Sequence, residues 1–272
     1  MKDNMAQTLF QRFSNIMRTT AQFDLPSYEH AHPLLIEQTV VGGRQVQMFY
    51  APFDDVNYAA RIAIVGMTPG ASQARQALNA ARQALVDGKT DDEAARIAKT
   101  HASFSGEPMR TNLVRMMDLV GIARLLGLAT TRTLWGEDSK LVHFTSALRY
   151  PVFVDGRNWS GTPDMVRTAK LCEWLMTWTG AELADLGDCV IVPLGPKVTA
   201  AMQHLAEQGL IDAAQIMEGM PHPSGANQER IASFLGDKPA DRCSVKTNPA
   251  ALAAALHKLT DKVKRLEDKR AM

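Results

Sequence analysis

Short apolar segments alternate with longer amphipathic segments along this chain, and that alternation is the feature that most limits its fold. The apolar segments are rich in β-branched residues, and we expect four strands there: one within residues 61–70, where a tight loop follows the strand, and three at residues 141–153, 188–195 and 214–220. Helical spacing follows most of them; in 249–270, leucines and a valine recur at intervals of four and three. The alternation predicts a three-layer α/β/α fold around a central, mainly parallel sheet of about four short strands.

Two regions are expected to lie outside this pattern. Residues 1–55 predict an N-terminal extension, with an amphipathic helix first and a hairpin around Gly42 and Gly43. Residues 71–100 are rich in Ala, Gln and Arg and predict a helical insertion, broken within 86–92. The 272 residues, 46% of them hydrophobic, can bury a sizeable core, and we expect a single domain.

The overall charge does not by itself indicate a nucleic-acid partner. Charged residues make up 22% of the sequence and the formal net charge is +1, so a nucleic acid could be met only through a local patch. Residues 241–272 supply one such patch, with eight Lys or Arg against four acidic residues. A solvated helix face is the simpler interpretation of most of these charges.

The cysteines are too widely separated to build a site. Cys172, Cys189 and Cys243 show no C-x-x-C spacing, which argues against a zinc site, an iron–sulfur cluster or a disulfide framework. We therefore expect a reduced, cytoplasmic protein with no metal and no cofactor. The N-terminal segment lacks the apolar run of a signal peptide, and no apolar stretch is long enough to span a membrane.

The loops after the expected strands are the place to look for chemistry, because ligands of parallel sheets bind beyond the carboxyl ends of the strands. Four loops meet this description and are expected to converge: GMTPGAS, TSALRYPVF, PLGPK and MPHPSGAN. The last loop holds His222 between Pro221 and Pro223. A structural alternative is a Pro-rich turn before a helix, with Ser224 or Asn227 as its N-cap.

These motifs together resemble a known family. GMTPG and HPSGAN are similar to the first and last active-site motifs of the uracil-DNA glycosylase superfamily, and VIVPLGPKVTAAM resembles its penultimate strand–helix unit. LVHFTSALRYPV occupies the place where many members carry a base-reading strand. The resemblance covers about residues 60–235, in the order of the family. It implies an enzyme that flips a base out of DNA and breaks the bond between base and sugar.

The resemblance implies a role for each matching position. His222 would donate a hydrogen bond to the departing base, on which negative charge grows. The base would be contacted by Gly66, Met67, Phe104 and Ser146. The DNA backbone would be contacted by Pro69, Gly70, Lys197, Pro223, Ser224, Gly225 and Asn227.

The first motif departs from the family pattern at Thr68, where many members place an Asp or Asn that positions the attacking water. A Thr hydroxyl cannot act as a general base at neutral pH. The stretch FSGEP resembles the F-T-G-D stretch of family-five enzymes, which implies Glu107 as the water-activating carboxylate and Phe104 as the stacking aromatic. The alternative for Glu107 is a charge that favours the helix dipole of 111–127; Asp155 and Asp164 are the next acids to consider.

A second departure concerns the base that is read. Ser146 stands where uracil-specific members commonly carry an Asn, so the pocket could be roomier than a uracil pocket. The chain also lacks the four-cysteine cluster of family-four and family-five enzymes. Some members of the superfamily are implicated in removing hypermodified phage bases, and single-strand-selective members are also similar. A modified or deaminated pyrimidine is therefore the expected target.

The sequence thus predicts a monofunctional, monomeric DNA glycosylase of base excision repair or antiviral defence, with Glu107, His222 and Thr68 as catalytic residues. Its partner would be DNA that contains a modified or deaminated base, with no membrane partner. One alternative is a catalytically inactive DNA-binding module of the same fold. Another is an unrelated α/β enzyme acting on a free nucleoside or nucleotide, although GMTPGAS lacks the ending of a P-loop.

Overall fold

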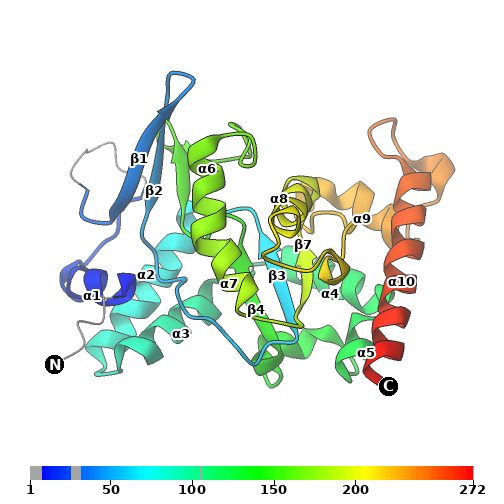
Figure 1. The fold of residues 1–272 in the computed structure, drawn as a ribbon, viewed down its shortest axis with the longest axis horizontal. Coiled ribbons are helices and arrows are strands. Elements are labelled where there is room, and N and C mark those ends of the chain that lie inside the picture. Colours follow the sequence, from blue (N-terminus) through cyan, green and yellow to red (C-terminus); the bar gives the residue numbers. More distant parts are fainter. Residues whose placement is uncertain (1–7, 26–31, 105, 272) are drawn as a thin grey trace. The chain divides into compact units, whose positions relative to one another are not determined.

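The chain folds as a mixed α/β protein in a computed structural model that describes residues 8–25, 32–104 and 106–271. It divides into two compact units, each made of three stretches of chain. The first unit takes residues 1–56, 67–103 and 145–179, and the second takes residues 57–66, 104–144 and 180–272. Both units are drawn in Figure 1, coloured along the sequence.

A small parallel sheet organises the second unit. Its three strands, in the order β4-β3-β7, are β3 Ile62–Gly66, β4 Val142–Ser146 and β7 Val190–Pro193. β3 and β7 pair in parallel from Ile62 opposite Val190 to Val65 opposite Pro193. Every residue of these two strands is buried, which is why both appear in the sequence as continuous apolar runs.

The fourth expected strand, residues 214–220, is not formed as a strand. It begins in a short 3-10 helix, η4 Ala213–Gln215, and meets β7 only in one parallel bridge between Ile216 and Ile191. Gly219 then turns the chain with a φ of +110°, and Pro221 has no N–H to donate to a ladder. Three strands therefore stand where about four were expected.

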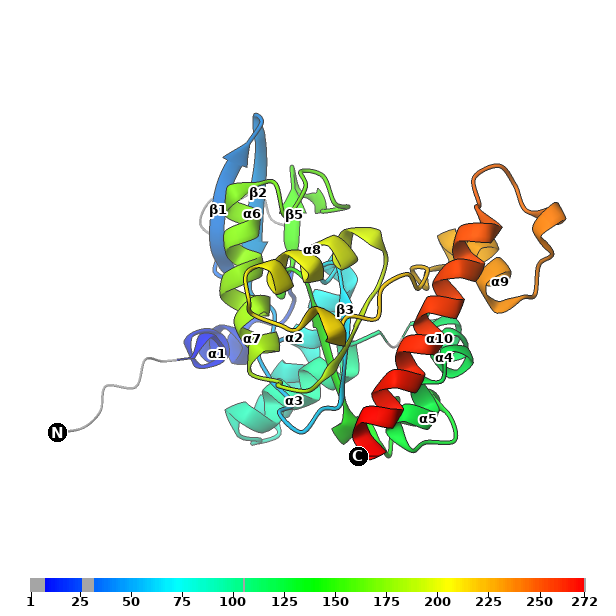
Figure 2. The same ribbon diagram turned by 45° about the vertical axis from the view of Figure 1, so that its right-hand side comes forward.

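Helices build most of the second unit. The α-helices are α4 Met109–Val120, α5 Ile122–Leu126, α7 Ala181–Ala184, α8 Pro196–Glu207, α9 Gln228–Leu235 and α10 Pro249–Ala271; the 3-10 helices also include η1 Thr131–Trp135, η2 Ser139–Leu141, η5 Gly225–Asn227 and η6 Ala240–Arg242. α4 and α5 were expected as one helix, but Gly121, with a φ of +93°, separates them. α10 packs along α4, α5 and α9, as Figures 1 and 2 show.

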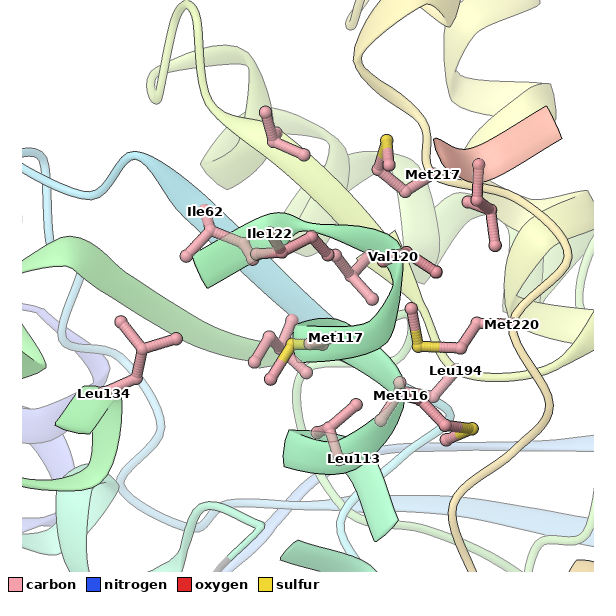
Figure 3. Close-up of a cluster of buried hydrophobic side chains, with 14 of the residues drawn as sticks. Ile62, Leu113, Met116, Met117, Val120, Ile122, Leu134, Leu194, Met217 and Met220 are labelled. Carbon is pink, nitrogen blue, oxygen red and sulfur yellow. The ribbon is translucent and has the colours of Figure 1, made fainter. Parts of the chain in front are cut away.

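The apolar core of the second unit is centred on α4. Leu113, Met116, Met117 and Val120 lie on the buried face of this helix. Figure 3 shows them among side chains from β3, α5 and the segments around β7 and η4: Ile62, Ile122, Leu194, Met217 and Met220. The core therefore joins α4 to the segment that leads toward His222.

An antiparallel sheet belongs to the first unit. Its strands, in spatial order, are β1 Leu35–Val41, β2 Arg44–Phe49, β5 Val152–Val154 and β6 Arg157–Asn158. The expected hairpin is confirmed, because Gly42 and Gly43 join β1 to β2 with φ values of 56° and 78°. The expected strand 141–153 is divided: β4 ends at Ser146, and β5 pairs with β2 instead.

The helices of the first unit include the expected insertion. α2 Ala71–Val86 and α3 Asp91–Ala102 form a helical pair, and α1 Leu9–Thr19 contacts both of them. α6 Ala169–Trp174 continues into a π-helix, η3 Leu175–Gly180. Within 8–25, 32–104 and 106–271, no helix combines the length and the apolar character needed to cross a bilayer.

Two leucines of α4 provide a matched test of this core. Leu113 is 0% exposed and Leu119 is 44% exposed on the same helix. Leu113→Ala should lower the free energy of unfolding by about 2–5 kcal/mol because it leaves a cavity in the core. Leu119→Ala should change it by about 0.5 kcal/mol or less. Denaturant titration measures both values, and equal losses would contradict the packing of α4 described above.

Candidate functional site

His222 lies in a tightly packed loop of the second unit. The loop after β7 passes so close that a Cβ on Gly195 would lie 3.3 Å from the Cβ of His222. Gly195 also has a φ of +95°, a conformation that favours glycine. A side chain at position 195 would press on His222 and would strain a backbone of positive φ, so glycine favours the close approach of these two loops.

The hydrogen bonding of His222 sets its tautomer. The backbone N–H of Ser224 donates to Nδ1 of His222 at 3.2 Å, so Nδ1 is an acceptor. In the neutral ring, the proton then resides on Nε2. Burial lowers the pKa of His222 below its usual 6.5, because the imidazolium is poorly solvated there. At neutral pH the side chain is thus a neutral hydrogen-bond donor at Nε2.

Glu107 precedes α4 and serves its N-terminus. Its carboxylate accepts a hydrogen bond from the backbone N–H of Thr111 at 3.2 Å and pairs with Arg110 at 3.2 Å. The hydrogen bond with Thr111 and the neighbouring Arg110 lower the pKa of Glu107. The side chain is ionised at neutral pH and 48% exposed. The alternative role at the helix terminus is present in the structure, and the water-activating role stays a prediction.

A buried amide joins the loop of His222 to the start of α4. Asn112 is 4% exposed, and its Nδ2 donates to the carbonyl of Pro223 at 2.9 Å. A Cβ on Gly225 would lie 3.5 Å from Cγ of Pro108, so the two segments also touch beside Glu107. The structure thereby brings together the segments that carry Glu107 and His222, and the catalytic roles of both residues stay predictions.

Asn112 was missed by the sequence analysis, although the sequence contains a signal. Apolar residues repeat on one face of this helix, and Asn112 falls on that buried face, one position before Leu113 and four before Met116. A polar residue on an apolar face requires a partner. Its partner, a proline carbonyl more than a hundred residues later, is visible only in the fold.

The remaining polar residues of the loop bond to each other. Nδ2 of Asn227 donates to Oγ of Ser224 at 3.1 Å. Neither side chain makes a capping hydrogen bond to the helix that follows it. Lys197, expected at the DNA backbone, is exposed in the first turn of α8.

Phe104 occupies an unusual backbone conformation in the second unit. Its φ is +46°, which is uncommon for an aromatic residue. Its ring is partly buried against the core, with its centroid 5.8 Å from that of Phe144. Such strain persists only where packing enforces it, and it is often associated with binding loops.

In the first unit, Thr68 ties two of the expected loops together. Its hydroxyl donates to the carbonyl of Tyr150 at 3.0 Å and accepts from the N–H of Val152 at 3.1 Å. The carbonyl of Met67 likewise accepts from Leu148 at 2.9 Å. The Thr68 hydroxyl thus makes two hydrogen bonds to backbone, and its catalytic role stays a prediction.

The other expected residues near Thr68 have local roles. Gly70 begins α2, and the N–H of Ala71 donates to Oδ1 of Asn158 at 3.0 Å. Pro69 is buried, and Gly66 is the buried last residue of β3 in the second unit. Ser146 ends β4, and its carbonyl accepts from Thr179 at 2.8 Å.

The two reserve acids have partners in the first unit. Asp155 pairs with Arg44 at 2.7 Å in the turn between β5 and β6, and the bond to Arg44 lowers its pKa. Asp164 accepts from the N–H groups of Val166 and Arg167, both at 3.0 Å. Both carboxylates therefore stabilise turns.

A pocket of about 550 Å³ opens beside His222 in the second unit. We call it the α8–α10 pocket, because it lies between the start of α8, the loop of His222, and α9 and α10. Its charged lining residues are Glu218, Arg230, Lys246 and Lys258. Over the described part of the chain, no group of three or more His, Cys, Asp or Glu side chains is arranged to hold a metal ion.

The chain is similar to the uncharacterized protein YoxB of Bacillus subtilis (strain 168). The two are 31% identical over 217 residues, which are 79% of this chain and 84% of that protein. No family model matches the chain, and no solved structure matches it. The name of this relative states no substrate, partner or activity.

The state of His222 can be tested directly. Two-dimensional ¹⁵N NMR of the imidazole should show the tautomer protonated at Nε2, with a pKa below 6.5. The exposed His257 serves as an internal comparison in the same spectra. A His222 ring protonated at Nδ1 at neutral pH would contradict the hydrogen bond from Ser224.

Proposed function

This chain belongs to the family of the Bacillus subtilis protein YoxB, and we propose that it is a DNA glycosylase of the uracil-DNA glycosylase superfamily. It flips a modified or deaminated pyrimidine out of DNA and hydrolyses the bond between base and sugar, leaving an abasic site. The proposal includes a three-layer α/β/α arrangement around the sheet β4-β3-β7. It places the enzyme in base excision repair or antiviral defence in the cytoplasm.

The observation that carries the proposal is the state of His222. A departing pyrimidine gains negative charge as its bond to the sugar lengthens, and a fixed neutral donor stabilises that charge without rearranging. The bond from Ser224 leaves the proton of His222 on Nε2, and burial favours the neutral ring.

The proposed reaction is a largely dissociative hydrolysis. The bond between C1′ and the base nitrogen breaks, its electron pair goes to the base, and Nε2–H of His222 donates a hydrogen bond to the departing base anion, which then takes a proton from solvent. Water adds to the cationic C1′ and gives up a proton, for which the ionised Glu107 is the proposed acceptor. Its negative charge also stabilises the cationic sugar. The products are the free base and an abasic site in an intact strand.

Substrate specificity is proposed from the residues that resemble base-reading positions. Phe104 stacks on the flipped base in this proposal, and its strained backbone is of the kind found in binding loops. Ser146, smaller than Asn, leaves room for a substituent on the ring. Met67 and Gly66 complete the proposed base contacts.

The second candidate is a DNA-binding module without catalysis. It is favoured by one observation: the carboxylate of Glu107 already has structural partners in Thr111 and Arg110. Oligonucleotides that each hold one modified or deaminated base separate the two functions. Alkali-labile breaks after incubation support the enzyme, whereas tight binding without any break supports the module.

Glu107→Gln is the sharpest test of Glu107 as the general base that takes a proton from water. Gln keeps the shape of the side chain and an oxygen that can accept from Thr111, but it removes the charge. Excision in single turnover should slow by a factor of about 10²–10⁴ while DNA affinity stays nearly unchanged. Thr68→Ala should slow excision far less, since its hydroxyl bonds only to backbone. If Glu107→Gln excises at the wild-type rate, the general base is a residue other than Glu107.

His222→Ala tests the donor. Loss of one fixed donor to the departing base should remove about 3 kcal/mol of transition-state stabilisation, roughly a hundredfold in rate. Circular dichroism and thermal melting should show a folded protein, and DNA affinity should stay within about threefold of wild type. Unchanged excision by this variant would exclude His222 from the reaction.

A further inference from the structure

The α8–α10 pocket carries positive charge that the second unit does not neutralise. Three cationic side chains line it against one carboxylate, so its lining has a formal charge of +2. Glu218 pairs with Lys258, and this pairing lowers the pKa of Glu218. Arg230 and Lys246 make no ion pair with any described carboxylate. The surplus charge therefore resides on these two residues.

The backbone at the start of α8 adds to the positive electrostatic potential of the pocket. α8 begins directly at the pocket, with Gly195 at its N-cap and Pro196 in its first turn, and no side chain caps it. The first N–H groups of a helix and the positive end of its dipole favour an anion. The pocket thus combines a helix terminus with two cations that pair with no carboxylate in the part of the chain that the structure describes.

The backbone segment that carries Lys246 is fastened to α9 before any ligand arrives. Arg230 donates to the carbonyl of Lys246 at 3.3 Å. Glu229 fastens the loop before α10 by accepting from Lys238 at 2.6 Å and from Thr247 at 2.7 Å. The hydrogen bond from Lys238, with those from the loop hydroxyls, lowers the pKa of Glu229 to about 2. The loop of Lys246 therefore stays fastened at any pH above that of strong acid.

The size and apolar wall of the pocket narrow the choice of ligand. About 550 Å³ exceeds the space that a bare inorganic anion needs. Met220, Leu252 and Ala255 provide an apolar surface beside the cations. An anionic group attached to a larger, partly apolar body fits this combination, as in a nucleotide.

We propose that the α8–α10 pocket binds a phosphate of the DNA strand together with the nucleotide that carries it, next to the flipped nucleotide. Arg230 and Lys246 contact the phosphate, and the apolar wall contacts the attached sugar or base. His222 lines the pocket, so a strand bound there passes the imidazole. The inference rests on the proposed function for its choice of DNA as the ligand.

Salt dependence of DNA binding tests the two contacts. Each phosphate contact contributes about 0.7–0.9 to the slope of log affinity against log salt, through counterion release. Because both side chains contact the same phosphate, Lys246→Ala and Arg230→Ala should each lower the magnitude of the slope by up to that amount and weaken binding roughly fivefold near 0.1 M salt. Arg230→Lys keeps the charge and should keep most of the slope. Fluorescence anisotropy of labelled single-stranded and duplex oligonucleotides measures these values.

Matched controls come from cations of the second unit outside the pocket. Arg132 and Lys140 are exposed and pair with no described carboxylate. Arg132→Ala and Lys140→Ala should leave slope and affinity unchanged. Equal slopes for wild type, Lys246→Ala and Arg230→Ala would overturn the inference, as would equal loss in all four variants.

A free nucleotide as the ligand is distinguished by a second titration. Deoxynucleoside monophosphates and inorganic phosphate are added to wild type and Lys246→Glu. Micromolar binding of a monophosphate that Lys246→Glu abolishes, with DNA binding unchanged, would overturn the assignment to DNA. If wild type excises a base while the slopes stay equal, the inference fails alone. If no base is excised but the slopes fall as expected, the proposed function fails alone.

Discussion

The arrangement around His222 depends on one buried hydrogen bond, from Nδ2 of Asn112 to the carbonyl of Pro223. A buried carbonyl without a partner costs roughly 1–3 kcal/mol, and the prolines of this loop offer few backbone donors of their own. Asn112 supplies the missing donor from the first turn of α4. Leu113, Met116 and Met117 pack the rest of that helix into the apolar core, so the hydrogen bond from Asn112 fixes the loop to the core.

The protonation states of His222 and Glu107, which lie on either side of this hydrogen bond, have opposite electrostatic causes. Burial lowers the pKa of His222 by penalising its charged form, so the ring is neutral at neutral pH. Hydrogen bonds at the start of α4 lower the pKa of Glu107 by favouring its charged form. A neutral donor and an ionised carboxylate are the two forms that the proposed hydrolysis requires. Both residues are already in these forms at neutral pH in the folded protein.

The same loop also lines the α8–α10 pocket, so His222 lies between the N-terminal region of α4 and this positively charged pocket. The net charge of the whole chain, +1, does not predict a positively charged pocket. Folding produces it by pairing Glu218 with Lys258 while no carboxylate of the described residues pairs with Arg230 or Lys246. A nearly neutral protein can in this way present a strongly local field.

Much of the local structure follows from the sequence alone. The periodic helices α2, α3, α8 and α10 and the buried strands β3 and β7 form where local pattern predicts them, since each pattern matches one backbone period. Gly42 and Gly43 likewise determine a hairpin, because both need a positive φ. His222 lies in a loop, as its neighbouring prolines predict, although the strand expected before it is not formed.

Only the tertiary structure decided which segments pair and which polar groups meet. Residues 141–153 read as one strand, but Val152 found its partner in Met48 of another sheet, a choice that no local pattern contains. Residues 214–220 have the composition of a strand and keep one bridge, because Gly219 turns them away from β7. Asn112 and Pro223, and Arg230 and Lys246, meet through contacts between distant segments or across a loop. Periodicity determines the type of an element, whereas its partners are determined by packing over the whole chain.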